Sequence, residues 1–313
     1  MLITIFTPIY NRANKLYRAY ESLKQQTIKK IDEQYIFEWI IVDDGSTDNT
    51  KELVEKWQKE SDFEIRYFYQ SNKGKIHALR KGIDLSKCEW FLQLDSDDAC
   101  KKETIEVFYN TINQFSNDEL ERCGGIGVLH QDQYGKPIGN DYPIEKKLLY
   151  TLDIIFKWRY LGLGDTWALL KTQNLKKSFI IPEEAKHLKF IPETFFWDRI
   201  TFELKPYSYF INKRLGIVYR NEDDNISHNI RQKYPEGFLF ESKWFINNYP
   251  NIFFKSPNAY IKHLLKYIIY SRHLNFNISD SLNILDNLLV KILFVSIYPI
   301  GILLSRYYLK VNK

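Results

Sequence analysis

Segments typical of strands and of helices alternate at short intervals through the first half of the chain, and this alternation constrains the fold more than any other feature. Short apolar runs typical of strands occupy residues 2–7, 39–42, 65–69, 90–94 and 125–129. Apolar residues at helical spacing follow the first two runs, at Leu16, Ala19, Tyr20 and Leu23 and then at Leu53, Val54 and Trp57. The pattern indicates an α/β fold with a mostly parallel, doubly wound sheet.

The C-terminal part of the sequence is typical of a helical extension. Ser256 and Pro257 form a common helix start, as N-cap and first helical residue. We predict a further helix from about residue 280 to 296, and Pro299 and Gly301 then interrupt the apolar stretch 292–304. At 13 residues that stretch is shorter than the ~20 that span a bilayer as a helix. We therefore predict an α/β domain over 1–225, with halves 1–98 and 99–225, and a basic amphipathic helical region over 226–313.

Composition and charge narrow the class of protein. The 313 residues are 44% hydrophobic and 27% charged, as in an ordered globular protein. The net charge is +5, and 11 Lys and Arg stand against 4 Asp and Glu from Asn225 onward. Basic amphipathic helices flanked by Tyr and Trp favour peripheral membrane contact over nucleic acid binding, with a solvated basic face as the alternative. Three cysteines without a CxxC pair, and no secretory signal, indicate the cytoplasm.

Two polar motifs follow the first two predicted strands. TPIYN contains Pro8, Tyr10 and Asn11, and the Tyr10 ring offers a face on which a nucleobase can stack, although a packed turn is the alternative. VDDGSTDNT places Asp43 and Asp44 after the second strand. A carboxylate there can accept the imide N–H of uracil or a ribose hydroxyl, while the nearby hydroxyls cap a helix. Both motifs lie where open α/β sheets bind ligands, at the carboxyl ends of strands.

A basic helix forms the third motif, NKGKIHALRKG. Asn72 and a glycine turn open this helix, and its N-terminus can face a diphosphate together with Lys75 and Arg80. An ordinary surface helix with solvated lysines is the alternative interpretation. The motif therefore predicts a phosphate contact centred on Lys75.

An acidic turn forms the fourth motif, in WFLQLDSDDA. An apolar strand there delivers Asp95, Ser96, Asp97 and Asp98 at its carboxyl end. Carboxylates this close repel one another unless a cation balances them, and a hard divalent ion bound by carboxylate and phosphate oxygens does so. The turn predicts a metal site, with a helix-capping turn as the alternative.

In their order and spacing these four motifs resemble those of the family 2 glycosyltransferases, which are inverting enzymes with the GT-A fold. The resemblance covers residues 2–98 and extends more loosely to about 227. It implies that Pro8, Tyr10 and Asp44 hold the base of a nucleotide sugar, that Asp95 contacts the ribose region, and that Asp97 binds a divalent metal, Mn²⁺ or Mg²⁺. It makes 1–98 the nucleotide-binding half and 99–225 the acceptor half of a transferase domain.

Other positions follow from the same resemblance. Donor contacts extend to Asn11, Asp43, Asn72, Lys75 and Ser96, and Asp95 joins Asp97 at the metal. Arg80 departs from the family pattern, since many relatives carry Asn there, although an arginine at this position can reach phosphate.

The resemblance also implies a catalytic base after the metal motif, where the matching stretch is IPETFFWDRI. Glu193 is the first candidate, although Thr194 stands where the family often has a second acid, and Asp198 is the alternative. An acid favoured by a helix N-terminus is the structural alternative for Glu193. We expect Asp165 and Trp197 to contact the acceptor.

These expectations describe an inverting transferase that moves a sugar, from a UDP-sugar, to a hydroxyl of a growing cell-surface or lipid-linked glycan at the inner membrane face. A sugar-nucleotide pyrophosphorylase is disfavoured because its Gly-rich loop after the first strand is missing from TPIYNRANK. A non-catalytic glycan-binding or scaffold subunit on the same fold is the second hypothesis. The sequence does not predict the oligomeric state.

Overall fold

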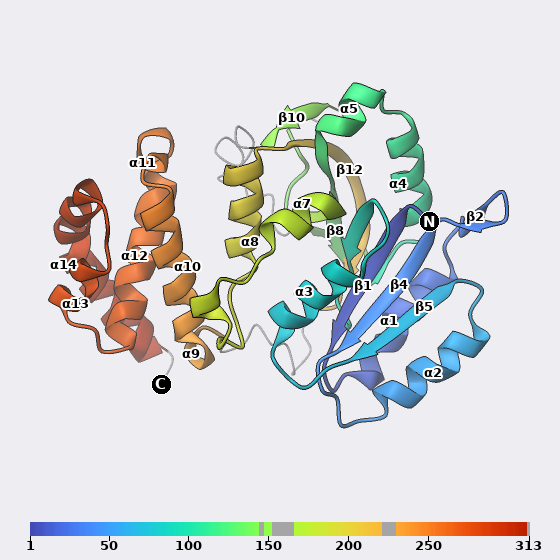
Figure 1. Ribbon diagram of the computed structural model, residues 1–313, viewed down its shortest axis with the longest axis horizontal. Helices are drawn as coiled ribbons and strands as arrows, with labels where there is room; N and C mark the ends of the chain where they lie inside the picture. The colour runs from blue at the N-terminus through green and yellow to red at the C-terminus, as the bar shows by residue number, and fades with distance from the viewer. Residues whose placement is uncertain (144–146, 152–165, 221–229, 312–313) are drawn as a thin grey trace. The chain divides into compact units, whose positions relative to one another are not determined.

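The computed structural model describes residues 1–143, 147–151, 166–220 and 230–311 (Figure 1). The chain forms two compact units. The first comprises Met1–Ile180 and Asp198–Asp223, and the second comprises Ile181–Trp197 and Asp224–Lys313. The functional boundary at residue 225 stays a prediction, and the segment 181–197 belongs to the second unit.

A ten-stranded sheet forms the centre of the first unit. Its strands are β1 Ile3–Ile9, β4 Phe37–Asp43, β5 Glu64–Tyr69, β6 Trp90–Gln93, β7 Ala99–Cys100, β8 Cys123–Asp132, β9 Pro137–Ile138, β10 Leu148–Tyr150, β11 Thr166–Lys171 and β12 Tyr207–Val218. The main order is β10-β12-β8-β11-β6-β1-β4-β5, with β7 paired to β12 and β9 paired to β8. A separate hairpin is made by β2 Lys30–Ile31 and β3 Gln34–Tyr35.

All five predicted strands are present, as β1, β4, β5, β6 and β8. The four strands β6, β1, β4 and β5 pair in parallel, so their carboxyl ends lie at one edge of the sheet. The rest of the sheet is mixed, because β11 runs antiparallel to both β6 and β8. The predicted mostly parallel arrangement therefore holds for these four strands and not for the whole sheet. Figure 1 shows β1, β4 and β5 side by side in the part of the sheet nearest the N-terminus.

Helices cover both faces of this sheet. The helices of the first unit are α1 Ala13–Lys24, α2 Thr50–Glu60, α3 Lys75–Leu85, α4 Thr104–Asn113, α5 Asn117–Arg122, α7 Thr172–Ser178 and the π-helix η2 Ile200–Leu204. Alternate residues of β1, such as Ile3 and Ile5, share a buried core with α1, α2 and α4. On the opposite face α3 approaches β1 so closely that a Cβ at Gly82 would lie 2.1 Å from the Phe6 ring. The doubly wound α/β fold is therefore confirmed.

The second unit is helical, as predicted for the C-terminal extension. Its elements are η1 Glu183–Ala185, α8 Thr194–Arg199 at the boundary of the units, α9 Ile230–Lys233, α10 Pro235–Asn248, α11 Ile252–Lys255, α12 Pro257–His273, α13 Ile278–Asn283 and α14 Leu288–Val311. The predicted start of α12 at Pro257 is confirmed. α12 packs between α10 and α14 (Figure 1). Tyr260 and Tyr267 are buried there, and each donates its hydroxyl to a backbone carbonyl, at Ile246 and Ser281.

The helix predicted over 280–296 is wrong in its bounds. Two helices occupy this region, because the Asn287 side chain accepts the N–H of Leu289 at 2.8 Å and begins α14 after the end of α13. α14 then continues through Pro299 to Val311. One helix among the described residues is therefore long and apolar enough to cross a membrane by length and composition, over Leu288–Arg306 with a mean hydropathy of 2.2. The prediction of an apolar stretch of only 13 residues is corrected accordingly.

Candidate active site

The acidic turn after β6 is fixed at the carboxyl edge of the sheet. β6 is buried between β1 and β11, and the N–H of Leu94 donates to the carbonyl of Phe6 at 2.8 Å. The hydroxyl of Thr7 donates to the carbonyl oxygen of Leu94 at 2.7 Å. These bonds determine where the chain leaves the sheet. The turn that follows carries Asp95, Ser96, Asp97 and Asp98.

Asp95 is paired with the lysine of the basic helix. The Nζ atom of Lys75, the first residue of α3, lies 3.0 Å from Asp95 Oδ2, and Gln93 Nε2 donates to Asp95 Oδ1 at 3.0 Å. Burial acts to raise the pKa of Asp95, but the Lys75 charge and the Gln93 hydrogen bond outweigh it, and the pKa lies below the ordinary value. The structure therefore brings Lys75 of the third motif and Asp95 of the fourth motif together.

Two arginines of the α1 segment contact Asp97, and neither contact was predicted from the sequence. The Arg12 guanidinium forms an ion pair with the Asp97 carboxylate, and Arg18 Nη1 donates to the backbone carbonyl of Asp97 at 3.2 Å. The Arg18 guanidinium also lies 4.0 Å from the centre of the Tyr219 ring, a cation–π contact. The available signal was a basic residue directly after TPIYN, at the carboxyl end of a strand next to β6.

Asp98 occupies a more protected position than its neighbours. Its Oδ1 accepts the backbone N–H of Tyr219 at 3.2 Å. Burial, followed by the negative charges of Asp95 and Asp97, raises the pKa of Asp98 to about 7. A cation bound in this turn would favour the ionised form of this carboxyl, because it offsets the two neighbouring charges.

Asp43, at the end of β4, is buried and holds its own loop. Tyr67 donates its hydroxyl to Asp43 Oδ2 at 2.6 Å, and the N–H of Ser46 donates to Oδ1 at 2.7 Å. Burial and the bond to Asp43 raise the pKa of Tyr67, so this tyrosine stays a neutral donor. The Asp43 carboxylate thus stabilises the turn that contains Gly45 and Ser46.

Asp44 connects that turn to the start of α3. Its Oδ1 accepts Gln70 Nε2 at 2.8 Å and the N–H of Lys73 at 2.9 Å, and its Oδ2 accepts the N–H of Gly74 at 2.7 Å. A carboxylate has about four acceptor positions, so three bonds leave one for a ligand. Gly45 permits the contact between the two loops, because its φ is +89° and a Cβ would lie 2.8 Å from the Asn72 nitrogen.

The first motif lies at the same edge. Pro8 is buried in β1 opposite Val42, whereas the side chain of Tyr10 is exposed. Asn11 has a φ of +49° and joins the VDDGS loop, since its N–H donates to Ser46 Oγ at 2.9 Å and its Oδ1 accepts the N–H of Thr47 at 2.7 Å. Tyr10 therefore lies on a loop that the hydrogen bonds of Asn11 hold against the VDDGS loop.

Three further donor candidates have different surroundings. Arg80 donates to both oxygens of Asp84 and to the carbonyl of Phe179 at 2.7 Å, so its guanidinium fastens α3 to the end of α7 rather than to the acidic turn. Asn72 is exposed in the loop before α3. Ser96 is buried within the turn itself. A phosphate contact by Arg80 would require it to leave these partners.

The candidate base and acceptor residues are divided between the units. Glu193 and Trp197 belong to the second unit and Asp198 to the first, and all three are partly buried at or near α8. Thr194, the expected second acid position, donates its hydroxyl to the buried carboxylate of Glu241 at 3.0 Å. Asp165 lies outside the described residues. The roles of these four residues stay predictions.

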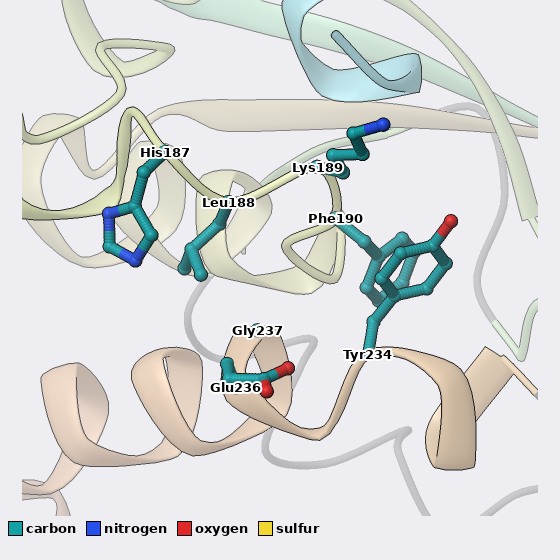
Figure 2. Close-up of a pocket in the computed structure, with 7 residues that line it drawn as sticks. All are labelled: His187, Leu188, Lys189, Phe190, Tyr234, Glu236 and Gly237. Atoms are coloured by element: carbon teal, nitrogen blue, oxygen red, sulfur yellow. The ribbon is translucent and has the colours of Figure 1, made fainter.

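A shallow pocket of about 260 Å³ lies in the second unit, next to the segment that carries Glu193. Figure 2 shows the rings of Phe190 and Tyr234 facing each other, and their centroids are 5.6 Å apart. Glu236 and His187 also line the pocket, while the Lys189 ammonium points away from it (Figure 2). Aromatic rings beside polar groups suit a sugar.

The acidic turn fits a divalent metal ion by its chemistry. Asp95 and Asp97 offer hard carboxylate oxygens, the ligands that Mg²⁺ and Mn²⁺ prefer. Their side chains are 36% and 20% exposed, so an ion that carries phosphate ligands can reach them. Lys75 and Arg12 beside them are the donors that phosphate oxygens take.

Comparison with known proteins places the four motifs within one matched family segment. The family model of Glycosyl transferase family 2 matches residues 4–118, which contain all four motifs. GlyG, a glycosyltransferase of Streptococcus pneumoniae, is 36% identical over 142 residues, or 45% of this chain and 42% of GlyG. An uncharacterized glycosyltransferase of Rickettsia bellii is 26% identical over 79% of this chain and 32% of its own length. The chain spans less than half the length of these curated relatives.

Solved structures identify the fold. S. aureus TarS residues 1–349, in complex with UDP-GlcNAc, superposes with a TM-score of 0.59 at 18% identity, over 95% of this chain and 79% of that one. The Pyrobaculum calidifontis mannosyltransferase PcManGT, in complex with GDP-Man and Mn²⁺, superposes with a TM-score of 0.58 at 13% identity, over 99% and 83%. Both are GT-A proteins, which confirms the expected fold. Residues 4–118 of this chain match the model of glycosyl transferase family 2, and the chain has a GT-A fold.

Proposed function

We propose that the protein is a metal-dependent glycosyltransferase that takes a sugar from a nucleoside diphosphate donor, a UDP-sugar, and transfers it with inversion to a glycan hydroxyl. The observation that carries this proposal is the pairing of Asp95 with Lys75 and of Asp97 with Arg12 at the carboxyl edge of the parallel strands. Carboxylates for a cation and cations for a diphosphate meet there. The UDP-GlcNAc complex of TarS and the Mn²⁺ complex of PcManGT support the donor class and the metal.

The chain's own residues supply the binding steps of this reaction. The exposed Tyr10 ring stacks on the base, and the remaining acceptor position of Asp44 receives its imide N–H. Lys75 and the N-terminus of α3 bind the diphosphate. A divalent ion at Asp97, with Asp95, would stabilise the negative charge that develops on the leaving diphosphate.

The acceptor side of the proposal rests on Glu193. We assign it the removal of the proton from the acceptor hydroxyl as that oxygen attacks the anomeric carbon, with Asp198 as the alternative base. Such a base contributes about 10²–10⁴-fold to the rate. Trp197 and Asp165 are assigned to acceptor contact, and a growing cell-surface or lipid-linked glycan is the proposed acceptor.

We place the enzyme in the cytoplasm, at the inner face of the membrane. The support is an apolar stripe on α14 whose side chains are exposed although one face of the helix packs on α12: Leu288, Ile292, Val295, Ile300 and Leu303. The 11 Lys and Arg from Asn225 onward would favour an anionic bilayer surface.

The test is nucleotide release from a panel of UDP-, GDP- and dTDP-sugars, with Mn²⁺, with Mg²⁺ and with EDTA. Slow, metal-dependent release from one donor supports the proposal and names the sugar. Binding of a donor or glycan without any release would favour the scaffold hypothesis instead. Release that is undiminished by EDTA would contradict the metal.

A further inference from the structure

Arg12 lies next to Asp97, the carboxylate proposed to bind the metal. None of the four motifs predicts this position of Arg12. It follows Asn11, whose positive φ of 49° turns the chain at the end of β1 toward the acidic turn. Its guanidinium forms an ion pair with the Asp97 carboxylate, 85 residues further along the chain. The side chains of Arg12 and Asp97 are only 11% and 20% exposed, so water screens this pair less than a surface pair.

The acidic turn is consequently balanced by the chain itself. Asp97 faces Arg12 and Asp95 faces Lys75, while Arg18 donates to the Asp97 carbonyl at 3.2 Å. The ligand oxygens of Asp95, Asp97 and Asp98, all among the described residues, do not form a group of three within 4.8 Å of one another. The carboxylates of Asp95 and Asp97 are therefore turned toward the chain's cations rather than toward a common ion.

Arg12 can bind a phosphate group in place of the Asp97 carboxylate. A guanidinium binds carboxylate and phosphate oxygens with the same planar pair of N–H donors. A donor bound between Tyr10 and Lys75 brings a diphosphate with several such oxygens to this edge of the sheet. A metal ion at Asp97 and the Arg12 guanidinium would share one carboxylate, and the positive charge of Arg12 opposes the approach of a second cation.

We propose that Arg12 is a resident counter-cation that weakens metal binding at Asp97 until the donor arrives, and that it then moves to the diphosphate and no longer opposes the metal. This inference rests on the proposed function, since it requires a diphosphate donor and a metal at Asp97. It predicts that nucleotide and metal bind in a coupled manner, with weak metal binding to the free protein.

The experiment measures Mn²⁺ binding to the full chain without nucleotide, from the electron paramagnetic resonance signal of free Mn²⁺. Arg12→Gln should bind Mn²⁺ about tenfold more tightly than wild type, within the usual range for coupled sites. In EDTA, the same variant should bind UDP more weakly in calorimetry, because one phosphate partner is lost. Arg122→Gln is the matched control, since it removes one positive charge from an exposed pair with Asp118 on α5.

Asp97→Asn provides a second arm that does not depend on the folding of the Arg12 variant. It removes the carboxylate partner of Arg12, so UDP affinity in EDTA should rise, while Mn²⁺ affinity falls. The inference is overturned if Arg12→Gln binds Mn²⁺ no more tightly than wild type, if Arg122→Gln gives the same gain, or if Asp97→Asn leaves UDP affinity in EDTA unchanged. Failure of every form to bind UDP would contradict the proposed donor, and the Mn²⁺ measurement would then decide the Arg12 pairing alone.

Discussion

The carboxylates at the carboxyl edge of the sheet fall into two groups with different surroundings. Asp43 and Asp44 are buried and accept hydrogen bonds from Tyr67 and from loop N–H groups, so they hold the loops in place. Asp95 and Asp97 are more exposed and are paired with cationic side chains. We propose that the second pair changes partners when a ligand binds, and that the first pair holds the loops against which that ligand would lie.

Lys75 offers a direct test of the diphosphate contact. Lys75→Met removes the ammonium that lies 3.0 Å from Asp95 Oδ2, so we expect UDP affinity to fall about tenfold or more, as for the loss of a charge-assisted hydrogen bond. Calorimetric titration with UDP and Mn²⁺ measures this change. Lys81→Met on the same helix is the control, because its Nζ donates to the Tyr69 carbonyl. Equal losses in the two variants would contradict a specific role for Lys75.

Asp48 gives a prediction about pH. Burial acts to raise the pKa of Asp48, but hydrogen bonds from Thr50 and from the N–H of Ala13 outweigh it, and the net pKa is lowered. A carboxyl with a lowered folded-state pKa stabilises the fold above its unfolded pKa of about 3.9, and this contribution is lost as pH falls through the folded value. Asp48→Asn should therefore lower Tm at neutral pH.

The difference in Tm between wild type and Asp48→Asn should shrink as the pH falls below about 4. Thermal melts followed by circular dichroism between about pH 7 and pH 3 measure it. A constant difference across that range would show that the charge of Asp48 contributes nothing.

The pairing of residues at the site was not predictable from local sequence. Asp95, Asp97 and Lys75 were found because each belongs to a motif at a strand end or a helix start. Arg12 was missed because its partner is 85 residues away and the contact depends on β1 lying next to β6. Tyr67 was missed for the same reason, since it reaches Asp43 from the neighbouring strand.

At the scale of elements, the position of α3 depends on one close contact. A Cβ at Gly82 would lie 2.1 Å from the Phe6 ring, so Gly82→Ala must push α3 away from β1. We expect a loss of about 1–3 kcal/mol in the free energy of unfolding, the usual cost of overpacking. Urea unfolding measures this loss, with Lys51→Ala on the exposed face of α2 as a control. A change within about 0.5 kcal/mol would mean that the ring moves aside freely.

Helices and strands were predictable from the sequence where the pattern of apolar residues matches the residues that are buried in the structure. The buried strands and the helices between them follow from apolar runs and helical spacing, and Pro257 marks the start of α12. The two helices after residue 277 were not resolved as separate, because the break depends on the capping bond of Asn287. Pro299 was interpreted as an interruption, but α14 continues through it. Gly301, which was interpreted in the same way, packs against Ile268 of α12.

At the scale of the whole molecule, the outward stripe of α14 supports the proposed membrane contact. Replacing Ile292 and Leu303 together by Glu should abolish binding to vesicles that contain anionic lipids, because two carboxylates would enter the interfacial region. Vesicle co-sedimentation at low and high salt measures the binding. The matched control is Ser279→Glu with Asn283→Glu on α13, two exposed polar positions. Unchanged binding by the α14 variant, or none by wild type, would contradict the contact.

We propose that donor and metal meet at the carboxyl ends of β1, β4 and β6. The most direct test is a crystal of the full chain grown with UDP and Mn²⁺, with anomalous scattering used to locate the ion. We expect one strong peak within coordination distance of Asp97, with the diphosphate between it and Lys75 and the uracil against Tyr10. An ion and nucleotide bound elsewhere, with Asp97 still paired to Arg12, would contradict it.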